Sequence, residues 1–597
     1  MAVKGVRRLP IWIAIVVPIL VIVLACGPGA EPTPTPVPTA TKAPAATPTA
    51  TPTAAPAATA TPTRPGPLAT PTPTAVAVAT PTPTPGKQPK RGGTLNLAVN
   101  PVPPSFDAQF LSVSADYFQA TTKLYSNLLL NYTEEVAECD VCSEWHLENN
   151  SKTIVFTLIK GIKFQTGQEL TSADVKYSLR MLMGDVDGII SQRSGVIKEY
   201  IESIEAPDKY TVRINLIRPS PFVPKILANA MSAIYKDGTT REGLKTAPAG
   251  SGPFLADKIV SGTTWSLVRN PNYFKPGQPY IDRVEITQVI DQVSRTAAFL
   301  TGRSDIWVRG GQIPEQFVPA FFKLADEGKV EFQELTGGTQ QGGVWMVVSK
   351  PPFSNLKLRQ AVNLALDRKR LQLVLTGAIP VHPQLIVYTE ASPYATRSDA
   401  QIWGVLPGWR TGAEKDREIE QAKQLMKDAG YPDGIDIEMD VRPDEPFPTT
   451  SQEVQKQLVP IGIRTKIKTV TSALQSERQA NQTYAIQHWN FVMTTKDPDE
   501  VIGQYWLTGA ARNITGYSNP QVDKLFVQMS SELDVAKRKQ LLSQIVDIIV
   551  LQDAGYAPTT SAYVYGFWWK RIQGVTVGQT MHSSAGLLRS DRLWIEQ

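Results

Sequence analysis

The stretch 144–183 constrains the fold more than any other part of this chain of 597 residues. Residues 153–159 alternate in the manner of a strand, and their apolar side chains on both faces predict that the strand is covered on both sides. Turn-forming glycines flank a second short apolar segment, 162–164, which we expect to form another strand. Thr171 and Asp174 have the spacing of a helix capping box, and apolar residues recur at helical spacing after them. The stretch therefore predicts a piece of mixed α/β core.

The order of residues in this stretch also forms a recognisable pattern. A tryptophan-containing element leads into a strand of the form T-x-x-F-x-L-x-x-G-x-x-F, and a helix of the form A-x-D-V-x-x-S follows. The residues that carry the pattern are Trp145, Thr153, Phe156, Leu158, Gly161, Phe164, Gly167, Ala173, Asp174, Val175 and Ser178. In this order they resemble the signature of the family 5 solute-binding proteins of ABC transporters, the peptide, nickel and oligopeptide-binding group. A chance likeness to an ordinary hairpin and helix is the alternative interpretation.

Further motifs resemble the same family and follow in its order. A GGTL…P-x-S-x-D opening lies at 92–107, and the elements G-x-G-P-F and R-N-x-x-Y-F lie within 250–307. An R-Q-A…A-x-D-R helix follows within 356–371, and helix-turn and loop-helix elements follow at 422–434 and 513–525. The resemblance therefore extends over about residues 90–570.

The resemblance implies an α/β fold of the two-lobed periplasmic-binding-protein type, class II, in the large form that family 5 adopts. Strands alternate with helices along the chain, as an α/β architecture requires. By the resemblance, a large lobe comprises 90–347 and a return segment, 556–597, and the second lobe comprises 348–555. The ligand cleft lies between the lobes, which close by a hinge motion.

The N-terminus has the features of an export signal. Basic residues precede an apolar run, 9–25, which ends at Cys26. As a helix this run would span only ~25 Å, short of the ~30 Å hydrocarbon core of a bilayer. Its ending, Val-Leu-Ala-Cys-Gly, resembles a bacterial lipoprotein box, which implies that 1–26 is a lipoprotein signal peptide and that Cys26 is lipidated. An uncleaved N-terminal anchor is the alternative, and either one places the bulk of the chain outside the cytoplasm.

Residues 27–89 consist mainly of Thr, Pro and Ala, with almost no charge and few large apolar side chains. Such a segment cannot bury enough surface to fold, so we expect a disordered linker. Its proline density favours extended polyproline II, with a reach of ~190 Å at ~3.1 Å per residue. We interpret the segment as a stalk that holds the folded part away from the membrane. A proline-rich docking site for another protein is the alternative.

Two of the three cysteines form a CxxC pair, Cys139 and Cys142. A redox-active pair would need a helix N-terminus to lower the thiol pKa, which the surrounding sequence does not indicate. A zinc site would need two further ligands, and the sequence has no second CxxC. The N-terminal sequence places the pair outside the cytoplasm, where disulfides persist, so we interpret it as a local structural disulfide.

Composition and motifs argue against several classes of function. The net charge of +5 comes from 60 basic and 55 acidic residues without a long run of one sign, so nucleic acid is not an expected partner. The sequence contains no HExxH, no P-loop and no G-x-S-x-G element, and its four histidines lack metal-ligand spacing. We therefore predict no catalytic residues, no metal site and no cofactor, and we expect a binding protein rather than an enzyme.

Aromatic residues are the candidate walls of a ligand cleft. Tyr125 is a candidate by the family resemblance, and Trp345 and Trp489 are favoured because each lies at the end of a predicted strand. The candidates are Phe106, Tyr125, Trp345, Trp489, Tyr505 and Trp506. Ordinary core positions are the alternative interpretation for at least half of them.

The segment 484–498 resembles the part of peptide-binding relatives in which an aspartate pairs with the peptide N-terminus. The corresponding position here is Thr494, and no carboxylate occurs from Trp489 to residue 496. Asp497 could take the role of that aspartate only if the loop is aligned differently, and Thr494 and Asp497 are both candidate ligand-binding residues. Since an unpaired buried ammonium costs several kcal/mol, we hypothesise that a free peptide N-terminus is not the main recognition element.

The resulting prediction is a monomeric, membrane-tethered receptor at the outer face of the cytoplasmic membrane. It would capture a peptide-like or other medium-sized solute between its lobes and deliver it to ABC permease subunits. A sensor or adhesion lipoprotein with the same fold is one alternative, and a secreted hydrolase is another. The ligand class stays open, because peptides, oligosaccharides and metal chelates all suit this scaffold.

Overall fold

The computed structural model describes residues 88–109, 115–131, 137–189, 195–310, 313–334, 340–376, 386, 394–443, 447–495, 497–561, 564–576 and 589–596. Residues 85–597 form one of two structural units of the chain, and all the described residues lie in that unit. The predicted signal peptide with Cys26 and nearly all of the predicted linker lie outside the described residues.

The stretch 144–183 contributes two strands to a four-stranded antiparallel sheet. Its strands, in spatial order, are β4 (Cys142–Glu148), β5 (Thr153–Leu158), β7 (Thr211–Leu216) and β6 (Ile201–Asp208). The predicted strand is confirmed as β5, which lies between β4 and β7 and is almost fully buried.

The helix predicted after this strand is confirmed as α2 (Ser172–Leu182), and its capping box forms between Thr171 and Asp174. The second short strand, predicted at 162–164, was wrong. In its place the structure has one isolated bridge, between Lys163 and Glu169. A bridge suffices here because the chain turns at once into α2 and leaves no length for a ladder.

A second four-stranded sheet has the order β1 (Thr94–Val99), β10 (Arg283–Gln288), β9 (Thr264–Arg269) and β8 (Phe254–Val260). A three-stranded antiparallel sheet joins β11 (Ile306–Gly310), β18 (Val564–Trp569) and β12 (Val330–Glu334). We call these sheets and the elements packed on them the first lobe. Its other elements are α1 (Ala115–Thr121), β2 (Leu129–Asn131), β3 (Ala137–Cys139), α3 (Gly195–Lys198), α4 (Phe222–Leu227), α5 (Gln292–Leu300), α6 (Val318–Asp326), β19 (Ile572–Gln573) and β20 (Trp594–Ile595).

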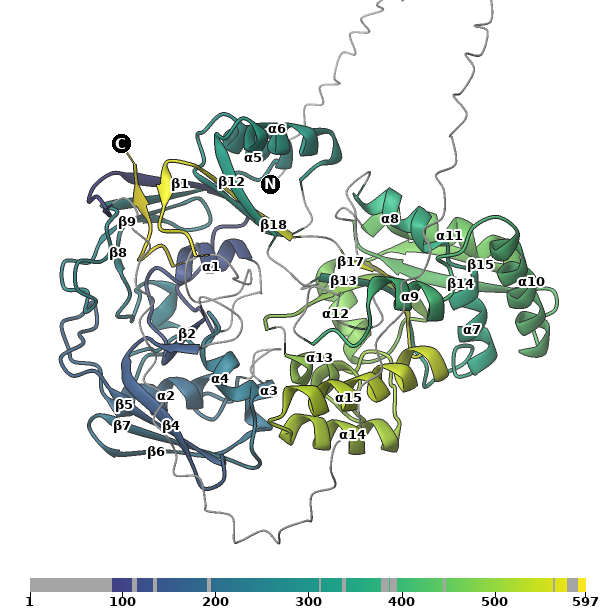
Figure 1. Cartoon of the computed structure of the whole chain (residues 1–597), viewed down its shortest axis with the longest axis horizontal. Coiled ribbons are helices and arrows are strands. Elements are labelled where there is room, and N and C mark those ends of the chain that lie inside the picture. Colours follow the sequence, from purple (N-terminus) through teal and green to yellow (C-terminus); the bar gives the residue numbers. More distant parts are fainter. Residues whose placement is uncertain are drawn as a thin grey trace, which may run out of the picture. The chain divides into compact units, whose positions relative to one another are not determined.

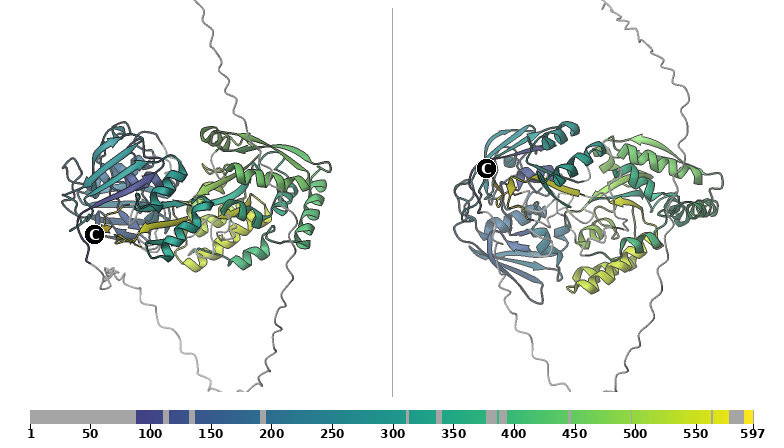
Figure 2. Two further views of the ribbon diagram at one scale, coloured as in Figure 1. Left: turned by 90° about the horizontal axis from the view of Figure 1, so that it is seen from above. Right: turned by 45° about the horizontal axis from the view of Figure 1, so that its top comes forward.

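The second lobe is built on a five-stranded sheet. Its strands, in spatial order, are β15 (Ile463–Thr469), β14 (Ile435–Val441), β16 (Ile486–Val492), β13 (Gln340–Met346) and β17 (Ala557–Ser561). The helices of this lobe are α7 (Leu356–Ala365), α8 (Arg368–Thr376), α9 (Asp399–Val405), α10 (Ala413–Asp428), α11 (Phe447–Leu458), α12 (Ser472–Ala480), α13 (Pro498–Tyr505), α14 (Pro520–Ser531) and α15 (Val535–Val546), and a π-helix continues α15 over Asp547–Gln552. Figures 1 and 2 show these helices around the sheet.

Alternation along β13 explains why both faces of this sheet are covered. Val344 and Met346 point into one apolar cluster, which also contains residues of α7, α10 and α11. Trp345 points the other way, into a cluster with residues of α13, α14 and α15. Two apolar faces on one strand require helices on both sides, which is the layering of an α/β lobe.

Consecutive strands change lobe twice: β12 lies in the first lobe and β13 in the second, and β17 lies in the second lobe and β18 in the first (Figure 1). Both β13 and β17 pair within the sheet of the second lobe, whereas the sequence analysis assigned 340–347 and 556–561 to the large lobe. Because paired strands move as one body, we propose that the second lobe extends over about 340–561.

Arg368, an arginine of the family motif, holds β17 by a side-chain hydrogen bond. The Arg368 side chain is fully buried and donates from Nε to the carbonyl of Pro558 on β17, and from Nη1 and Nη2 to the carbonyl and side-chain oxygens of Asn363. Burial lowers its pKa to about 9, so the guanidinium stays charged at neutral pH. The motif residue therefore serves the fold.

The glycines of the Gly-Ser-Gly-Pro-Phe motif allow a close approach of two backbones. A Cβ at Gly252 would lie under 3.0 Å from backbone atoms of Leu124 and Tyr125, and the Gly252 amide donates to the Leu124 carbonyl over 2.9 Å. We expect Gly252→Ala to destabilise the protein by ~2–3 kcal/mol, since neither backbone can give way. Denaturant unfolding followed by circular dichroism measures the loss.

Gly404 provides the control for this substitution. It lies in α9, and a Cβ added there would have no atom within 4 Å, so Gly404→Ala should be neutral or stabilising. Equal effects of the two substitutions would contradict the steric explanation.

A second prediction concerns acid stability and rests on His488 of β16. Its ring is buried, Nδ1 lies 3.0 Å from Thr450 Oγ1, and burial lowers its pKa to about 4. The unfolded chain takes up a proton at its ordinary pKa of ~6.5, whereas the folded chain does not until about pH 4. Stability from this residue is therefore complete above pH ~6.5 and is lost as the pH falls to about 4, by ~3 kcal/mol in total.

Comparing His488→Gln with the unchanged chain isolates this contribution. Glutamine keeps a hydrogen-bonding group but does not titrate, so the difference in unfolding free energy between the two chains should change with pH only between about 6.5 and 4. A pH-independent difference would show that His488 titrates normally.

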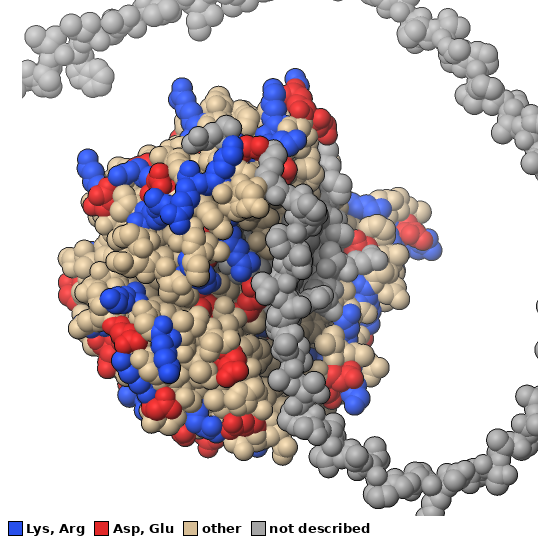
Figure 3. Space-filling model, turned by 60° about the vertical axis from the view of Figure 1, so that its left-hand side comes forward, with Lys and Arg blue, Asp and Glu red and all other residues tan. Residues whose placement is uncertain are grey.

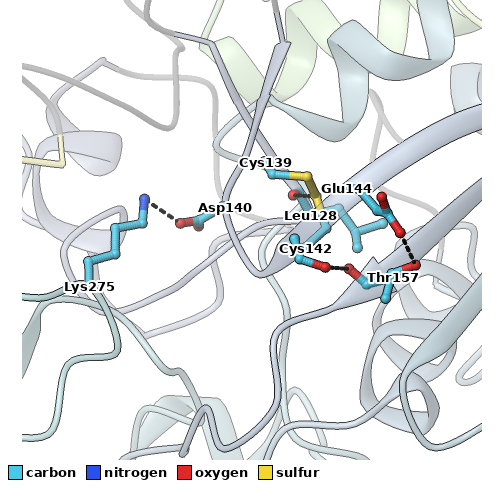
Figure 4. Close-up of a disulfide and its surroundings, with 8 residues drawn as sticks. Leu128, Cys139, Asp140, Cys142, Glu144, Thr157 and Lys275 are labelled. Carbon is cyan, nitrogen blue, oxygen red and sulfur yellow. Dashed lines mark hydrogen bonds and ion pairs between the residues drawn. A yellow bond between two sulfur atoms is a disulfide. The ribbon is translucent and has the colours of Figure 1, made fainter. Parts of the chain in front are cut away.

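The structure joins Cys139 and Cys142 by a disulfide, which brackets Asp140 (Figure 4). The Asp140 carboxylate lies 2.8 Å from Lys275 Nζ and is fully buried.

Figure 3 shows acidic and basic side chains interspersed on the surface it displays. None of the helices in the described ranges has the length and apolar composition that a membrane span requires.

Candidate functional site

Three buried carboxylates, those of Asp497, Asp499 and Glu500, lie at the N-terminus of α13. The sequence Asp-Pro-Asp-Glu places Asp497 at the N-cap, where its side chain accepts from the Asp499 amide, and proline at the first helical position. Acidic side chains are favoured there, because the first turn of a helix presents unpaired amides and a positive dipole end. Asp497 and Asp499 are fully buried, so they require partners beyond the helix itself.

Arg538 of α15 is the main partner of both aspartates. Its guanidinium contacts Asp497 with both terminal nitrogens, one of them at 2.8 Å, and also pairs with Asp499. Burial opposes the charge on Asp497, but Arg538 and Lys225 outweigh it and hold the pKa of Asp497 below its ordinary value. Burial raises the pKa of Asp499, and the charge of Asp497 adds to that effect.

Side chains of the first lobe complete this cluster. Lys225 of α4 donates to Asp497 Oδ2 over 2.8 Å and to Tyr394 Oη over 2.7 Å. Burial disfavours its charge, but Asp497 and Tyr394 together outweigh burial and raise the pKa of Lys225. Tyr200 donates to Asp499 Oδ2 over 2.9 Å. The cluster of Asp497, Asp499, Arg538, Tyr394, Lys225 and Tyr200 therefore spans both lobes, and we call it the interlobe cluster.

Thr494, which the sequence analysis expected at the position of the relatives' aspartate, is buried and hydrogen-bonded through its amide, hydroxyl and carbonyl groups. Its amide and its hydroxyl both donate to Glu500, over 2.8 and 2.9 Å. Its carbonyl accepts from Asn229 Nδ2 of the first lobe over 3.1 Å. Thr494 and Asp497 thus both lie where the two lobes meet.

Four of the aromatic candidates come together in the second lobe. Trp345 stacks on Trp506 at 5.4 Å between ring centroids, and it contacts Trp489 at 5.6 Å and Tyr505 at 6.0 Å. Tyr556, which the sequence analysis did not select, also belongs to this group, 5.0 Å from Trp345. Trp489 is partly exposed, whereas the other three candidates are buried in the apolar core. These three positions agree with the alternative core interpretation.

Phe106 and Tyr125 lie apart from this group, in the core of the first lobe. Phe106 packs on Trp265 at 4.8 Å between centroids, and its carbonyl accepts from Tyr125 Oη over 2.7 Å. Tyr125 meets Tyr235 edge to face. Both candidates are almost fully buried.

Sequence reasoning missed Lys225, Tyr200, Tyr394 and Arg538. One of them left a signal: Arg538, Leu542 and Ile545 lie at helical spacing on one face of α15, and all three are buried. A charged residue on an apolar face predicts a buried partner. Nothing comparable marks Lys225, whose partner is 272 residues away.

Among the described residues, no group of three or more histidines, cysteines, aspartates or glutamates could hold a metal ion. The acidic side chains of the interlobe cluster are instead bonded to arginine, lysine, tyrosine and backbone amides. Such an arrangement can hold the two lobes together.

Comparison with known proteins gives consistent results. Residues 138–513 match the model of the bacterial extracellular solute-binding proteins, family 5 middle region. The chain is 24% identical over 505 residues to heme-binding protein A of Haemophilus influenzae, covering 78% of this chain and 86% of that protein. It is also 24% identical over 481 residues to the glutathione-binding protein GsiB of Escherichia coli K12, covering 75% and 87%.

Solved structures share the fold. The periplasmic binding protein DppA from Helicobacter pylori, in complex with the peptide STSA, superposes with a TM-score of 0.70 at 20% identity, over 85% of this chain and 99% of that one. The oligopeptide-binding protein AppA from Bacillus subtilis, in complex with a nonapeptide, superposes with a TM-score of 0.67 at 20% identity, over 85% and 100%. The predicted α/β, two-lobed fold of the family 5 type is thereby confirmed.

Proposed function

Because this chain belongs to the bacterial extracellular solute-binding proteins of family 5, we propose that it captures a solute between its two lobes and delivers it unchanged to the permease of an ABC importer. The match to the family model over 138–513 carries this proposal. Capture and release require a hinge between the lobes, and consecutive strands change lobe twice along the chain, from β12 to β13 and from β17 to β18.

The solute is peptide-like or of comparable size. The similar proteins are named for heme, glutathione and peptides, which share a medium size and several polar groups on an apolar frame. The partly exposed Trp489, backed by Trp345 and Tyr505, offers an aromatic wall for such a molecule. Since Thr494 stands in place of a carboxylate and is already engaged with Glu500, a free amino terminus is not the main recognition element.

The protein works at the outer face of the cytoplasmic membrane as a monomer. Cys26 carries the lipid anchor, and residues 27–89 form the linker to the folded part. Replacing Cys26 by serine should release the protein into the medium or periplasm, and the mass of the mature N-terminal peptide should report the lipid.

Native mass spectrometry of the protein as purified is the first test of the function. We expect a co-purified solute, which calorimetry should then show to bind the stripped protein and which should be recovered chemically unchanged. Uptake of the same solute should fall when the gene for this chain is deleted. Binding without any effect on uptake would favour a sensor, and recovery of an altered solute would favour an enzyme.

Peptide probes test the recognition element. The tetrapeptide STSA and its N-acetylated form should bind with affinities within a few-fold of each other. A loss of about a hundredfold on acetylation, equal to ~2.7 kcal/mol, would overturn the view that the amino terminus contributes little.

A further inference from the structure

The interlobe cluster contains a charge balance that neither lobe achieves alone. The second lobe supplies Asp497 and Asp499, with a single guanidinium, that of Arg538, shared between them. The first lobe supplies the second cation, Lys225, whose ammonium reaches a carboxylate with no exposed surface. Without Lys225, two buried carboxylates would share one positive charge.

Two further contacts between the lobes fall on the same short segment. Tyr200 donates to Asp499, which Ser530 of α14 also contacts, at 2.6 Å. Asn229, four residues after Lys225, donates to the Thr494 carbonyl over 3.1 Å. Three side chains of the first lobe thus hold residues 494–499 of the second, and each bond must break if the lobes part there.

We propose that Lys225 is the built-in cation that closes the two lobes over the N-terminus of α13, and that it keeps cationic groups of a solute away from Asp497. The second part rests on the proposed function, whereas the first part does not. The physical reason is that a tethered ammonium competes with a free one at a high effective concentration. Removing one partner of a buried charge pair is costly, so the closed arrangement depends on Lys225.

This proposal assigns a specificity role to a residue outside the aromatic wall. A solute that carries an ammonium near Asp497 would have to displace Lys225 and leave it without its carboxylate. A solute with a neutral or anionic group at this place would meet an already satisfied surface. The site therefore selects against cationic groups at this point.

Hydrogen exchange of the full-length protein, followed by mass spectrometry, tests closure. In Lys225→Ala, amides of the peptides that contain α4 and residues 494–506 should exchange at least about tenfold faster, and the two peptides should change together. Lys225→Arg should retain protection, because it keeps the charge. Protection unchanged in Lys225→Ala would overturn the proposal.

Chemical rescue separates the role of the charge from that of packing. Lys225→Ala leaves a space beside a carboxylate, so n-butylammonium should bind this variant by calorimetry and restore protection of both peptides. It should do neither in the unchanged protein nor in Lys225→Met, whose side chain fills the space, and an equal concentration of sodium chloride should not substitute. Equal responses of all three chains to n-butylammonium would contradict the proposed role.

Tyr200→Phe provides an independent variant if Lys225→Ala does not fold. Loss of the hydrogen bond from the Tyr200 hydroxyl to Asp499 should accelerate exchange in the same two segments, to a smaller extent than Lys225→Ala. Unchanged exchange would count against the proposed closure of the lobes. None of these measurements needs the natural solute. Failure to find a solute would therefore weaken the proposed function only. The closure by Lys225 would still be decided by the exchange and rescue experiments.

Discussion

Arg538→Met is expected to lower the free energy of unfolding by ~3–5 kcal/mol, because it leaves Asp497 and Asp499 buried without their shared cation. Arg538 lies in the interior with 1% of its side chain exposed, and both carboxylates are fully buried. Methionine fills most of the same volume, so loss of packing contributes little. Denaturant unfolding followed by circular dichroism at neutral pH measures the change.

Arg464→Met is the matched control for this substitution. Arg464 also pairs with an aspartate, Asp436, over 2.9 Å, but the two side chains are 52% and 80% exposed. Exposed pairs contribute ~0–1 kcal/mol, so this variant should remain close to the unchanged protein. Losses of similar size in both variants would show that burial of the Arg538 pair has no special effect.

Arg589→Met should produce a loss of the same order, ~3–5 kcal/mol, by releasing the C-terminal segment from the first lobe. The fully buried Arg589 donates to both Asp140 oxygens, over 2.5 and 3.0 Å, and to Tyr273 Oη over 2.7 Å. It connects residues 449 positions apart in the sequence. In this variant Asp140 would keep one cationic partner, Lys275, whose side chain is partly exposed.

Arg592→Met, three residues further along, tests whether burial or mere attachment matters. Arg592 pairs with Glu138 over 3.2 Å, with 37% and 35% of the side chains exposed. We expect a loss of less than ~1 kcal/mol from this variant. A comparable loss from Arg589→Met would mean that the C-terminal segment contributes little to stability.

Local pattern was sufficient for one strand and for the start of one helix, although it was wrong for the strand expected at 162–164. The period-2 run became β5, and the spacing of Thr171 and Asp174 produced the capping box of α2. Gly252 and Arg368 belong to the family motifs, and the structure explains both. Gly252 allows a close approach of two backbones, and Arg368 donates a hydrogen bond to the strand β17. These features involve a few consecutive residues or a residue type that only one geometry tolerates.

The candidate site was only partly accessible to the same reasoning. Four of the aromatic candidates, Trp345, Trp489, Tyr505 and Trp506, do meet in space, and the first two were favoured because they lie at predicted strand ends. Sequence could not tell which of them would be covered, since exposure depends on α13 and α14 packing over the sheet. Asp497 was considered as a ligand partner, but the structure pairs it with Arg538 and Lys225.

By itself, the sequence determined the α/β class, because strand and helix periods are local properties of a chain. The resemblance of its motifs to family 5 implied the two-lobed plan. Only the tertiary structure decided that Lys225 meets Asp497 across 272 residues and that Arg589 meets Asp140 across 449. Pairings at such separations leave no periodic trace in the sequence. They depend on how the lobes and the C-terminal segment come together, and the burial of the charges then makes each pairing obligatory.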